Sequence, residues 1–404
     1  MPAESPDATS RRPALPWGAV ALGFASTFMV MGNRAAYAVI YPAIVADLDW
    51  SVAELTTGYS IGLFGYVPAV VVAGLLMDRI GVRITMICGA ATVTLGMLLV
   101  SLSSTLPLMT VGFTLWGGLG TAFAGFVTVM KMLSIRAPER FAVAFGMAYV
   151  GQGVGSGLMS PIIQLAVDQY GWRVATAIAS ATGVGVLLMA ARLAPGREVV
   201  HAHRHGPQSH QQSPSMRTWP FALLFLGNAM LGSQMLIPTH QVAHLLESGF
   251  APIVAATAAG LWGAFSAVGG GAGGWILERL GSKRLLILAF AVTTVGQMAV
   301  MAAYPQAVVL VALYVLGSGL GRGLQSVALV SAQARVCSGP SSGKLLGVLD
   351  LGFGLGAFLG PWLTAIVHDR VESFNPGMTS GIVACGVVMI SVLTANALAG
   401  ARHR

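Results

Sequence analysis

Charged residues are scarce in this sequence. Only 9% of its 404 residues are Asp, Glu, Lys or Arg, and 55% are hydrophobic. A typical soluble domain carries about 25% charged residues. So few charges leave too little polar surface to cover a soluble globule of this length, which excludes an ordinary soluble enzyme. The apolar content also excludes a disordered chain, because disordered chains are poor in apolar residues.

Cysteine is scarce as well. The chain has three cysteines, Cys88, Cys337 and Cys385, which is an odd number. They lie in apolar stretches and lack the spacing of a zinc site. We therefore expect neither a disulfide framework nor a structural metal. His240 and His244 have the i,i+4 spacing of a metal pair, but no third ligand is evident, so we predict no metal site. The Gly269-x-Gly271-x-x-Gly274 pattern lacks the strand–turn–helix context of a dinucleotide site, and no P-loop is present, so we expect no cofactor and no ATP-driven pump.

Long apolar runs are abundant instead. A helix needs roughly 20 residues to cross about 30 Å of hydrocarbon. Twelve stretches qualify, at 17–41, 57–77, 82–102, 107–129, 141–165, 173–192, 219–245, 253–277, 285–303, 306–329, 344–366 and 379–399. The first is too long for a signal peptide and lacks a cleavage site. We predict an all-α membrane protein with twelve transmembrane helices in two pseudo-symmetric six-helix bundles.

The positions of the cations predict the orientation. With the N-terminus inside, eighteen of the 22 Lys and Arg residues fall on the cytoplasmic side, Arg173 and Arg370 fall outside, and Arg34 and Arg322 fall within spans. This asymmetry follows the positive-inside rule and predicts a multi-pass protein of the cell inner membrane with both termini cytoplasmic. The net charge of +8 then reflects orientation in a lipid bilayer, and we expect no nucleic-acid partner.

One polar interruption divides the chain. We interpret residues 194–218 as a cytoplasmic linker between bundles at 14–193 and 219–400, with cytoplasmic tails at 1–13 and 401–404. The linker contains several histidines, and a metal-binding tract is the alternative interpretation.

The two halves repeat each other at an offset of 200 residues. The second and the eighth stretch are each followed by a glycine, an acid, an arginine, a second glycine and a cation. These residues are Gly74, Asp78, Arg79, Gly81 and Arg83 in the first half, and Gly274, Glu278, Arg279, Gly281 and Lys283 in the second. Parallel repeats of this kind are typical of transporters with two rocking bundles.

The repeated element resembles the signature loop of the major facilitator superfamily. The resemblance implies that Gly74 lets the second helix approach a neighbour closely, and that Asp78 lies at a helix N-terminus, where the helix dipole favours an anion. It also implies that Arg79 and Arg83 close the cytoplasmic side by pairing. The ten loop residues would then work a gate without contacting substrate. The alternative is that they only anchor a cytoplasmic turn.

Other motifs resemble the monocarboxylate-transporter-like and oxalate/formate-antiporter-like branch. They are the end of the first stretch, from Tyr37 to Ser51, and Tyr170-Gly171-Trp172-Arg173. One departure matters. Members of that branch commonly carry an arginine in the eighth helix, where this chain has Gly269 to Gly271, and its cation is Arg322 in the tenth stretch. The eighth-helix substrate site is therefore not transferred to this sequence.

Three charges lie within apolar stretches: Arg34, Arg322 and Asp350. Each costs at least about 2.5–3.5 kcal/mol to insert, so such residues usually face a cavity and are functional candidates. Arg34 and Arg322 come from different halves, and guanidinium groups bind carboxylates in a bidentate manner. We predict that the two arginines hold an organic anion. The alternative is that they bind backbone carbonyls or pair with Asp350.

Asp350 is the candidate proton carrier. A monoanion crossing against 100 mV faces about 2.3 kcal/mol, which a co-transported proton cancels. A fixed ion pair of Asp350 is the alternative. Further polar residues of the first, fifth and seventh stretches are candidates to line the substrate path. They are Asn33, Tyr37, Tyr41, Gln152, Gln234 and His240.

These observations predict a monomeric secondary transporter, not an enzyme. The expected substrate is a small organic anion, in particular a monocarboxylate, moved by proton symport or anion exchange. Proton-driven efflux of a drug-like or secondary metabolite is one alternative. A membrane receptor that does not transport is another, against which the two intact signature loops argue.

Overall fold

The computed structural model describes residues 15–137, 141–195, 219–336 and 342–401. Both predicted tails, except Ala401, and the histidine-containing part of the predicted linker lie outside these ranges. All regular secondary structure within them is helical, as predicted. The first half contains α1 (Trp17–Leu48), α2 (Val52–Phe64), α3 (Tyr66–Ile80), α4 (Val82–Leu102), α5 (Leu106–Phe113), a π-helix (Thr114–Gly120), α6 (Thr121–Ala124), α7 (Phe126–Arg136) and α8 (Phe141–Leu193). The second contains α10 (Trp219–Ser233), α11 (Leu236–Glu247), α12 (Pro252–Met301), α13 (Val308–Val336), α14 (Ser342–Val371) and α15 (Asn375–Ala401).

Ten segments of the described chain are long and apolar enough to cross a membrane. Two of them, Ala144–Leu193 and Pro252–Met301, have 50 residues each, more than twice the length that a bilayer requires. Each contains one glycine outside the helical conformation, Gly171 and Gly281. Each long element is therefore two crossings joined at a glycine, which yields the twelve transmembrane helices that the sequence predicts.

The same backbone turn occurs at three of the short connections. Gly81, between α3 and α4, has φ 90° and ψ 162°, while Gly171 has φ 78° and ψ 165° and Gly281 has φ 74° and ψ 164°. This region of backbone conformation is essentially restricted to glycine. The recurrence of glycine at 81 and 281 in the repeated loop therefore has a local cause, because only glycine adopts this turn without strain.

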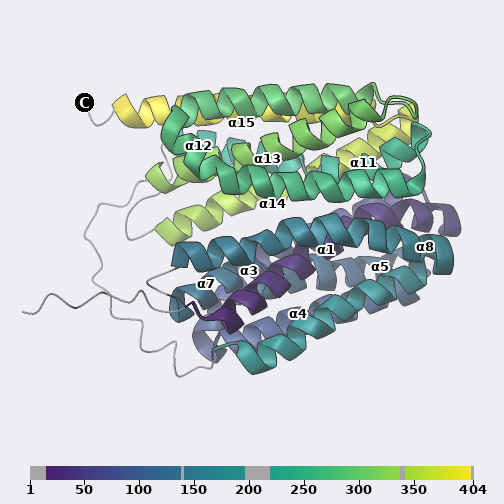
Figure 1. Cartoon of the computed structure of the whole chain (residues 1–404), viewed down its shortest axis with the longest axis horizontal. Coiled ribbons are helices and arrows are strands. Elements are labelled where there is room, and N and C mark those ends of the chain that lie inside the picture. Colours follow the sequence, from purple (N-terminus) through teal and green to yellow (C-terminus); the bar gives the residue numbers. More distant parts are fainter. Residues whose placement is uncertain (1–14, 138–140, 196–218, 337–341, 402–404) are drawn as a thin grey trace, which may run out of the picture.

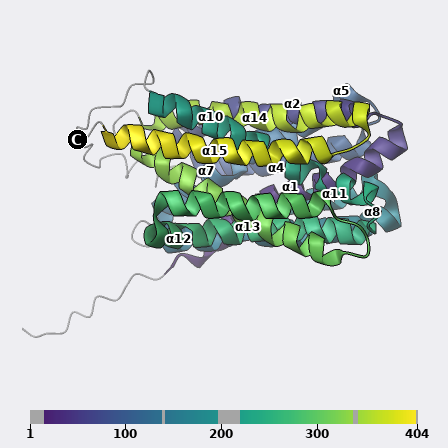
Figure 2. The ribbon, with the colours of Figure 1, turned by 90° about the horizontal axis from the view of Figure 1, so that it is seen from above.

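The two halves lie side by side as two bundles of long helices (Figures 1 and 2). Helices α1 to α8 form the purple-to-teal bundle, and α10 to α15 form the green-to-yellow one (Figure 1). Arg83 Nε donates to the carbonyl of Ala194 over 2.8 Å, beside the end of α8. Asn396 Nδ2 donates to Ser282 Oγ over 3.3 Å, near the end of α15. Both signature loops thus lie at the end of the molecule where α8 and α15 finish, here called the terminal end; the opposite end is the far end.

Small residues face each other where α12 of the second half packs on α8 of the first. A Cβ added to Gly260 of α12 would lie 2.9 Å from the carbonyl oxygens of Ser156 and Gly157 on α8. Small residues permit such close packing of helices in membranes. Phe64 of α2 also packs on Phe358 of α14, with ring centroids 6.0 Å apart. These contacts lie in the middle and far parts of the interface.

Candidate functional site

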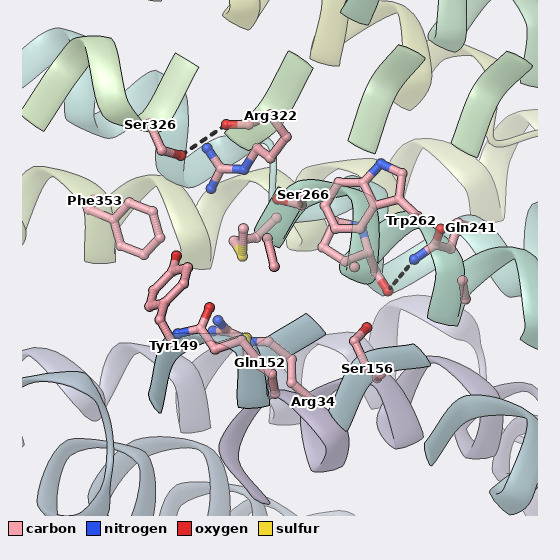
Figure 3. A pocket seen from close by; sticks show the side chains of 17 residues that line it. Arg34, Tyr149, Gln152, Ser156, Gln241, Trp262, Ser266, Arg322, Ser326 and Phe353 are labelled. Atoms are coloured by element: carbon pink, nitrogen blue, oxygen red, sulfur yellow. Dashed lines mark hydrogen bonds between the residues drawn. The ribbon is translucent and has the colours of Figure 1, made fainter. Parts of the chain in front are cut away.

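A cavity of about 190 Å³ lies between the two halves (Figure 3). Its walls come from α1 and α8 on one side, and from α11, α12, α13 and α14 on the other. The residues that line it are Met31, Arg34, Ala35, Tyr149, Gln152, Ser156, Met235, Pro238, Gln241, Ala259, Trp262, Gly263, Ser266, Ala267, Arg322, Ser326 and Phe353. Its position at the interface of two repeats is where substrate sites of such transporters occur.

The structure brings the two predicted arginines to this one cavity. Arg34 comes from α1 in the first half and Arg322 from α13 in the second (Figure 3). Arg322 is 6% exposed, its backbone oxygen accepts a hydrogen bond from Ser326 Oγ over 2.9 Å, and its Nη1 has no hydrogen-bond partner in the described chain. Arg34 is half-buried and lies across the cavity from Arg322 (Figure 3). Burying an unpaired cationic group is costly, so this cavity favours an anion.

Among the residues that the structure describes, no carboxylate lines the cavity. Asp350 is exposed on α14, one turn before Phe353, and no ion pair joins it to either arginine in the part of the chain that the structure describes. Pairing with Asp350, the alternative considered for the arginines, is therefore absent from this conformation. The positive charge of the cavity remains available to a ligand.

Neutral polar groups complete the walls. Tyr149, Gln152 and Ser156 have i, i+3 and i+7 spacing and lie on one face of α8. Across the cavity, Gln241 Oε1 accepts from the Tyr314 hydroxyl over 2.6 Å, and Gln241 Nε2 lies 3.5 Å from the carbonyl of Pro238. Trp262 Nε1 donates to Ser318 Oγ over 3.0 Å, so the polar edge of the indole is satisfied within the second half.

Of the six predicted polar residues of the path, Gln152 lines the cavity and the other five lie elsewhere. Asn33 Nδ2 donates to Thr182 Oγ1 over 3.1 Å, and Gln234 Nε2 donates to Gln325 Oε1 over 2.9 Å. Tyr37 stacks on Tyr59 with ring centroids 3.5 Å apart, inside the first half. Tyr41 and His240 bind each other at the far end. The cause is helical rotation: Asn33 and Arg34 are adjacent in sequence and so point in directions about 100° apart.

Seven polar or aromatic residues of the cavity were not predicted from the sequence. They are Tyr149, Ser156, Gln241, Trp262, Ser266, Ser326 and Phe353. A usable signal existed for three of them, because Tyr149 and Ser156 share a helix face with Gln152, and Ser326 lies one turn after Arg322. The others are ordinary residues of membrane helices and carry no such signal.

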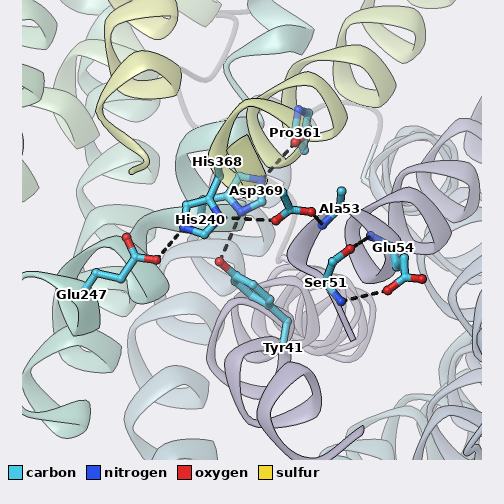
Figure 4. A network of polar contacts seen from close by, with 9 residues as sticks. All are labelled: Tyr41, Ser51, Ala53, Glu54, His240, Glu247, Pro361, His368 and Asp369. Atoms are coloured by element: carbon cyan, nitrogen blue, oxygen red, sulfur yellow. Dashed lines mark hydrogen bonds and ion pairs between the residues drawn. The ribbon is translucent and has the colours of Figure 1, made fainter. Parts of the chain in front are cut away.

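A polar network joins the halves at the far end (Figure 4). The Tyr41 hydroxyl lies 3.2 Å from His240 Nδ1, and His240 Nε2 lies 3.1 Å from the carbonyl oxygen of Pro361. Because a carbonyl only accepts, His240 Nε2 carries a hydrogen and Nδ1 accepts from Tyr41. The backbone N–H of Ala53, in the first turn of α2, donates to Asp369 Oδ2 over 3.0 Å. Two hydrogen bonds thus cross the interface here.

His368 supports this network from within the second half. Its Nε2 lies 2.7 Å from Glu247 Oε1, and its Nδ1 lies 3.5 Å from Asp369 Oδ1. The His368 ring stacks on Phe374, which in turn stacks on His240. His240 and His244 do not share a ligand: His244 Nε2 lies 3.1 Å from the carbonyl of Val300. Within the described ranges no group of three His, Cys, Asp or Glu residues could hold a metal ion.

The signature-loop residues lie at the terminal end and pair within their own halves. Arg83 binds Ala194, and the Arg279 guanidinium lies 3.9 Å from the ring centroid of Trp275. Arg79, Glu278 and Lys283 are exposed, and the side chain of Asp78 lies outside the described part of the structure. The close approach expected at Gly74 is absent, because a Cβ added to Gly74 or Gly274 would meet no heavy atom within 4 Å. In this conformation both glycines therefore face open space among the described residues.

Comparison with known proteins identifies the family of this chain. The profile described as Major Facilitator Superfamily matches residues 23–361 and 229–399. Monocarboxylate transporter 13 of Bos taurus is 26% identical over 382 residues, covering 93% of this chain and 87% of that protein. Monocarboxylate transporter 11 of Homo sapiens is 27% identical over 253 residues, covering 60% of this chain and 53% of that protein.

A solved structure shares the fold. The crystal structure of a mutant of the nucleoside transporter NupG superposes with a TM-score of 0.71, covering 94% of this chain and 99% of that one at 12% sequence identity. At that identity the likeness concerns the fold alone. Together with the twelve helices and the duplicated loop, these matches show that the chain belongs to the major facilitator superfamily, as a multi-pass membrane transporter of the monocarboxylate-transporter-like branch.

Proposed function

We propose that the protein is a secondary active transporter that binds a small organic anion, of the monocarboxylate class, between Arg34 and Arg322. The observation that carries this proposal is the cavity itself. Two guanidinium groups from opposite halves line it, and among the described residues the buried Nη1 of Arg322 has no partner and no carboxylate stands in the walls. A carboxylate accepts paired hydrogen bonds from a guanidinium, so it suits this site in geometry and in charge. The protein thus performs transport without chemistry on its substrate.

Alternating access is the proposed mechanism. The far end is joined by Tyr41–His240 and Ala53–Asp369, whereas the loops at the terminal end bind their own halves. Breaking the far-end contacts while the terminal end closes would expose the same cavity to the other side. In this proposal the terminal end is cytoplasmic and the membrane is the cell inner membrane. The bundles at 14–193 and 219–400 rock about the linker at 194–218.

Proton symport and anion exchange both fit an electrically balanced cycle. Asp350 is the proposed proton carrier, acting from the exposed face of α14 and not from within the cavity. Because one chain supplies both walls of the cavity, we propose a monomer as the working unit. The ten signature-loop residues are proposed to form the closing surfaces of the terminal end.

Uptake of labelled carboxylates by proteoliposomes tests the proposal. We expect uptake that increases with an inward proton gradient or with carboxylate on the opposite side. Arg34→Ala and Arg322→Ala should each reduce uptake about 10- to 100-fold. Each change removes a charge-assisted hydrogen bond, which contributes about 1.5–3 kcal/mol to binding. Arg284→Ala, an exposed arginine of the terminal end, is the matched control. Unchanged uptake in both cavity variants refutes the anion site.

Asp350→Asn separates the two coupling modes. If Asp350 carries the proton, this variant loses gradient-driven uptake but retains exchange of labelled for unlabelled carboxylate. Gradient-driven uptake equal to that of the unmodified protein contradicts the assignment of Asp350 and leaves the arginine site untouched.

A further inference from the structure

A second hollow, of about 1010 Å³, lies beside the arginine cavity. The two spaces share four wall residues: Tyr149, Ser266, Ala267 and Ser326. The hollow therefore borders the cavity at these four residues. It runs between α7 and α8 of the first half and α12 and α13 of the second, toward the terminal end.

The walls of this groove have a different chemistry from those of the cavity. Of the described residues that line it none is charged, and its side walls include Phe126, Phe145, Leu261, Val268 and Val330. Glycines on both sides leave it open: a Cβ added to Gly146 or Gly271 would meet no heavy atom within 4 Å. An extended apolar group fits such a surface, because burying apolar area is favourable.

The positive charge of Arg322 at the inner end of the groove indicates that the ligand also carries an anionic group. Arg322 is 94% buried and its Nη1 is unpartnered, and it lies one turn from Ser326, which belongs to both spaces. The inner end of the groove thus offers a cationic hydrogen-bond donor, and the rest of the groove offers an apolar surface. One molecule with an anionic head and an apolar tail would match both. A short carboxylate would fill the cavity of about 190 Å³ and leave the larger space empty.

We propose that the substrate is an amphipathic carboxylate, whose head binds Arg34 and Arg322 and whose extended apolar tail lies in the groove between α8 and α12. This assignment rests on the proposed anion site and adds the tail-binding surface to it. It predicts that affinity depends on tail length, with Tyr149, Ser266 and Ser326 at the point where head and tail meet.

Binding of a homologous series measures the tail directly. Full-length protein in phosphatidylcholine nanodiscs is titrated calorimetrically with acetate, butanoate, hexanoate and octanoate, and empty nanodiscs are subtracted. We expect affinity to increase by up to about fourfold per added methylene, the factor that burial of one CH₂ provides. Octanol should bind much more weakly than octanoate, because it has no charge for Arg322.

Two variants fill the groove without touching the arginines. Gly271→Leu and Gly146→Leu should remove the dependence on tail length while leaving butanoate binding within twofold. Gly185→Leu on α8 is the matched control, because its added side chain also meets open space but lies outside the groove. Melting temperatures show whether each variant folds, and Gly271→Ala gives a smaller, graded change where leucine is not tolerated.

The outcomes separate the two proposals. If short carboxylates bind through Arg322 but octanoate binds no tighter than butanoate, the tail groove is wrong and the anion site stands. A gain with tail length that survives in both filled variants also overturns the groove. A further outcome is that octanol binds as tightly as octanoate, with an affinity that Arg322→Ala does not change. That result would identify the groove as a lipid-binding surface and would also overturn the tail proposal. If no carboxylate of any length binds, the anion site fails, and the tail proposal fails with it.

Discussion

The two ends of the interface between the halves differ in how they are held. At the far end, side chains and backbone of opposite halves bind each other directly, through Tyr41–His240 and Ala53–Asp369. At the terminal end, Arg83 and Arg279 bind partners within their own halves, and Gly74 has open space around it. Both ends nevertheless use the same glycine turn, at Gly171 on one side and at Gly81 and Gly281 on the other. The turn therefore does not decide which end is joined; the contacts between the halves do.

The largest effect is expected from a wedge between the halves beside the cavity. Gly260→Leu places a side chain against the carbonyl oxygens of Ser156 and Gly157, which lie 2.9 Å from an added Cβ. Because backbone cannot yield as a flexible side chain does, the halves should be held apart and uptake should fall at least tenfold. Spin labels at exposed positions Gln169 and Thr379 report the separation at the far end. A variant that keeps both uptake and label distance shows that this contact does not hold the end closed.

The next effect concerns the turns that the two ends share. Gly81→Ala, Gly171→Ala and Gly281→Ala should each reduce the free energy of unfolding by about 1–3 kcal/mol, because alanine is strained in this backbone region. Gly274→Ala, in open space within α12, is the matched control and should be neutral or slightly stabilising. Thermal unfolding in detergent measures all four. Equal stability of the turn variants and the control would contradict the structural role of these glycines.

A smaller effect is expected from the ionic contact across the far end. Asp369→Ala removes the acceptor for the Ala53 N–H and one partner of His368. A hydrogen bond to a charged group contributes about 1.5–3 kcal/mol when buried, and less here because Asp369 is partly exposed. The spin-label distribution should shift several-fold toward the state that is open at the far end. Asp168→Ala, which removes a carboxylate that binds only Gln164 of its own half, should leave the distribution unchanged.

The smallest effect is expected from Tyr41→Phe. The change removes one hydroxyl and leaves His240 Nδ1 without its donor, while the ring packing of position 41 is retained. The loss of about 0.5–1.5 kcal/mol should increase the far-open population by a few-fold. A shift larger than that of Asp369→Ala would reverse the ranking and place the main far-end contact at His240.

Sequence analysis predicted the membrane helices well, while the roles that it assigned to the site residues remain predictions. The twelve crossings follow from apolar length, and the repeated glycine of the loops coincides with a turn that only glycine adopts. Arg34 and Arg322 were identified because charge is rare within apolar stretches. Asn33, Gln234 and Tyr37 were assigned to the path on polarity alone, and each instead binds or packs within its own half.

The sequence by itself determined the class of protein, the number of helices and the two arginines within them, because hydrophobic length and the cost of burying charge are local properties. Only the tertiary structure decided which residues meet. Rotation about a helix axis sets which neighbour a side chain faces, and it placed Tyr149, Trp262 and Ser266 beside the arginines. The relative position of the halves joined His240 to Tyr41 at one end and left an uncharged groove at the other. That position depends on contacts between residues about 200 apart, which no local pattern specifies.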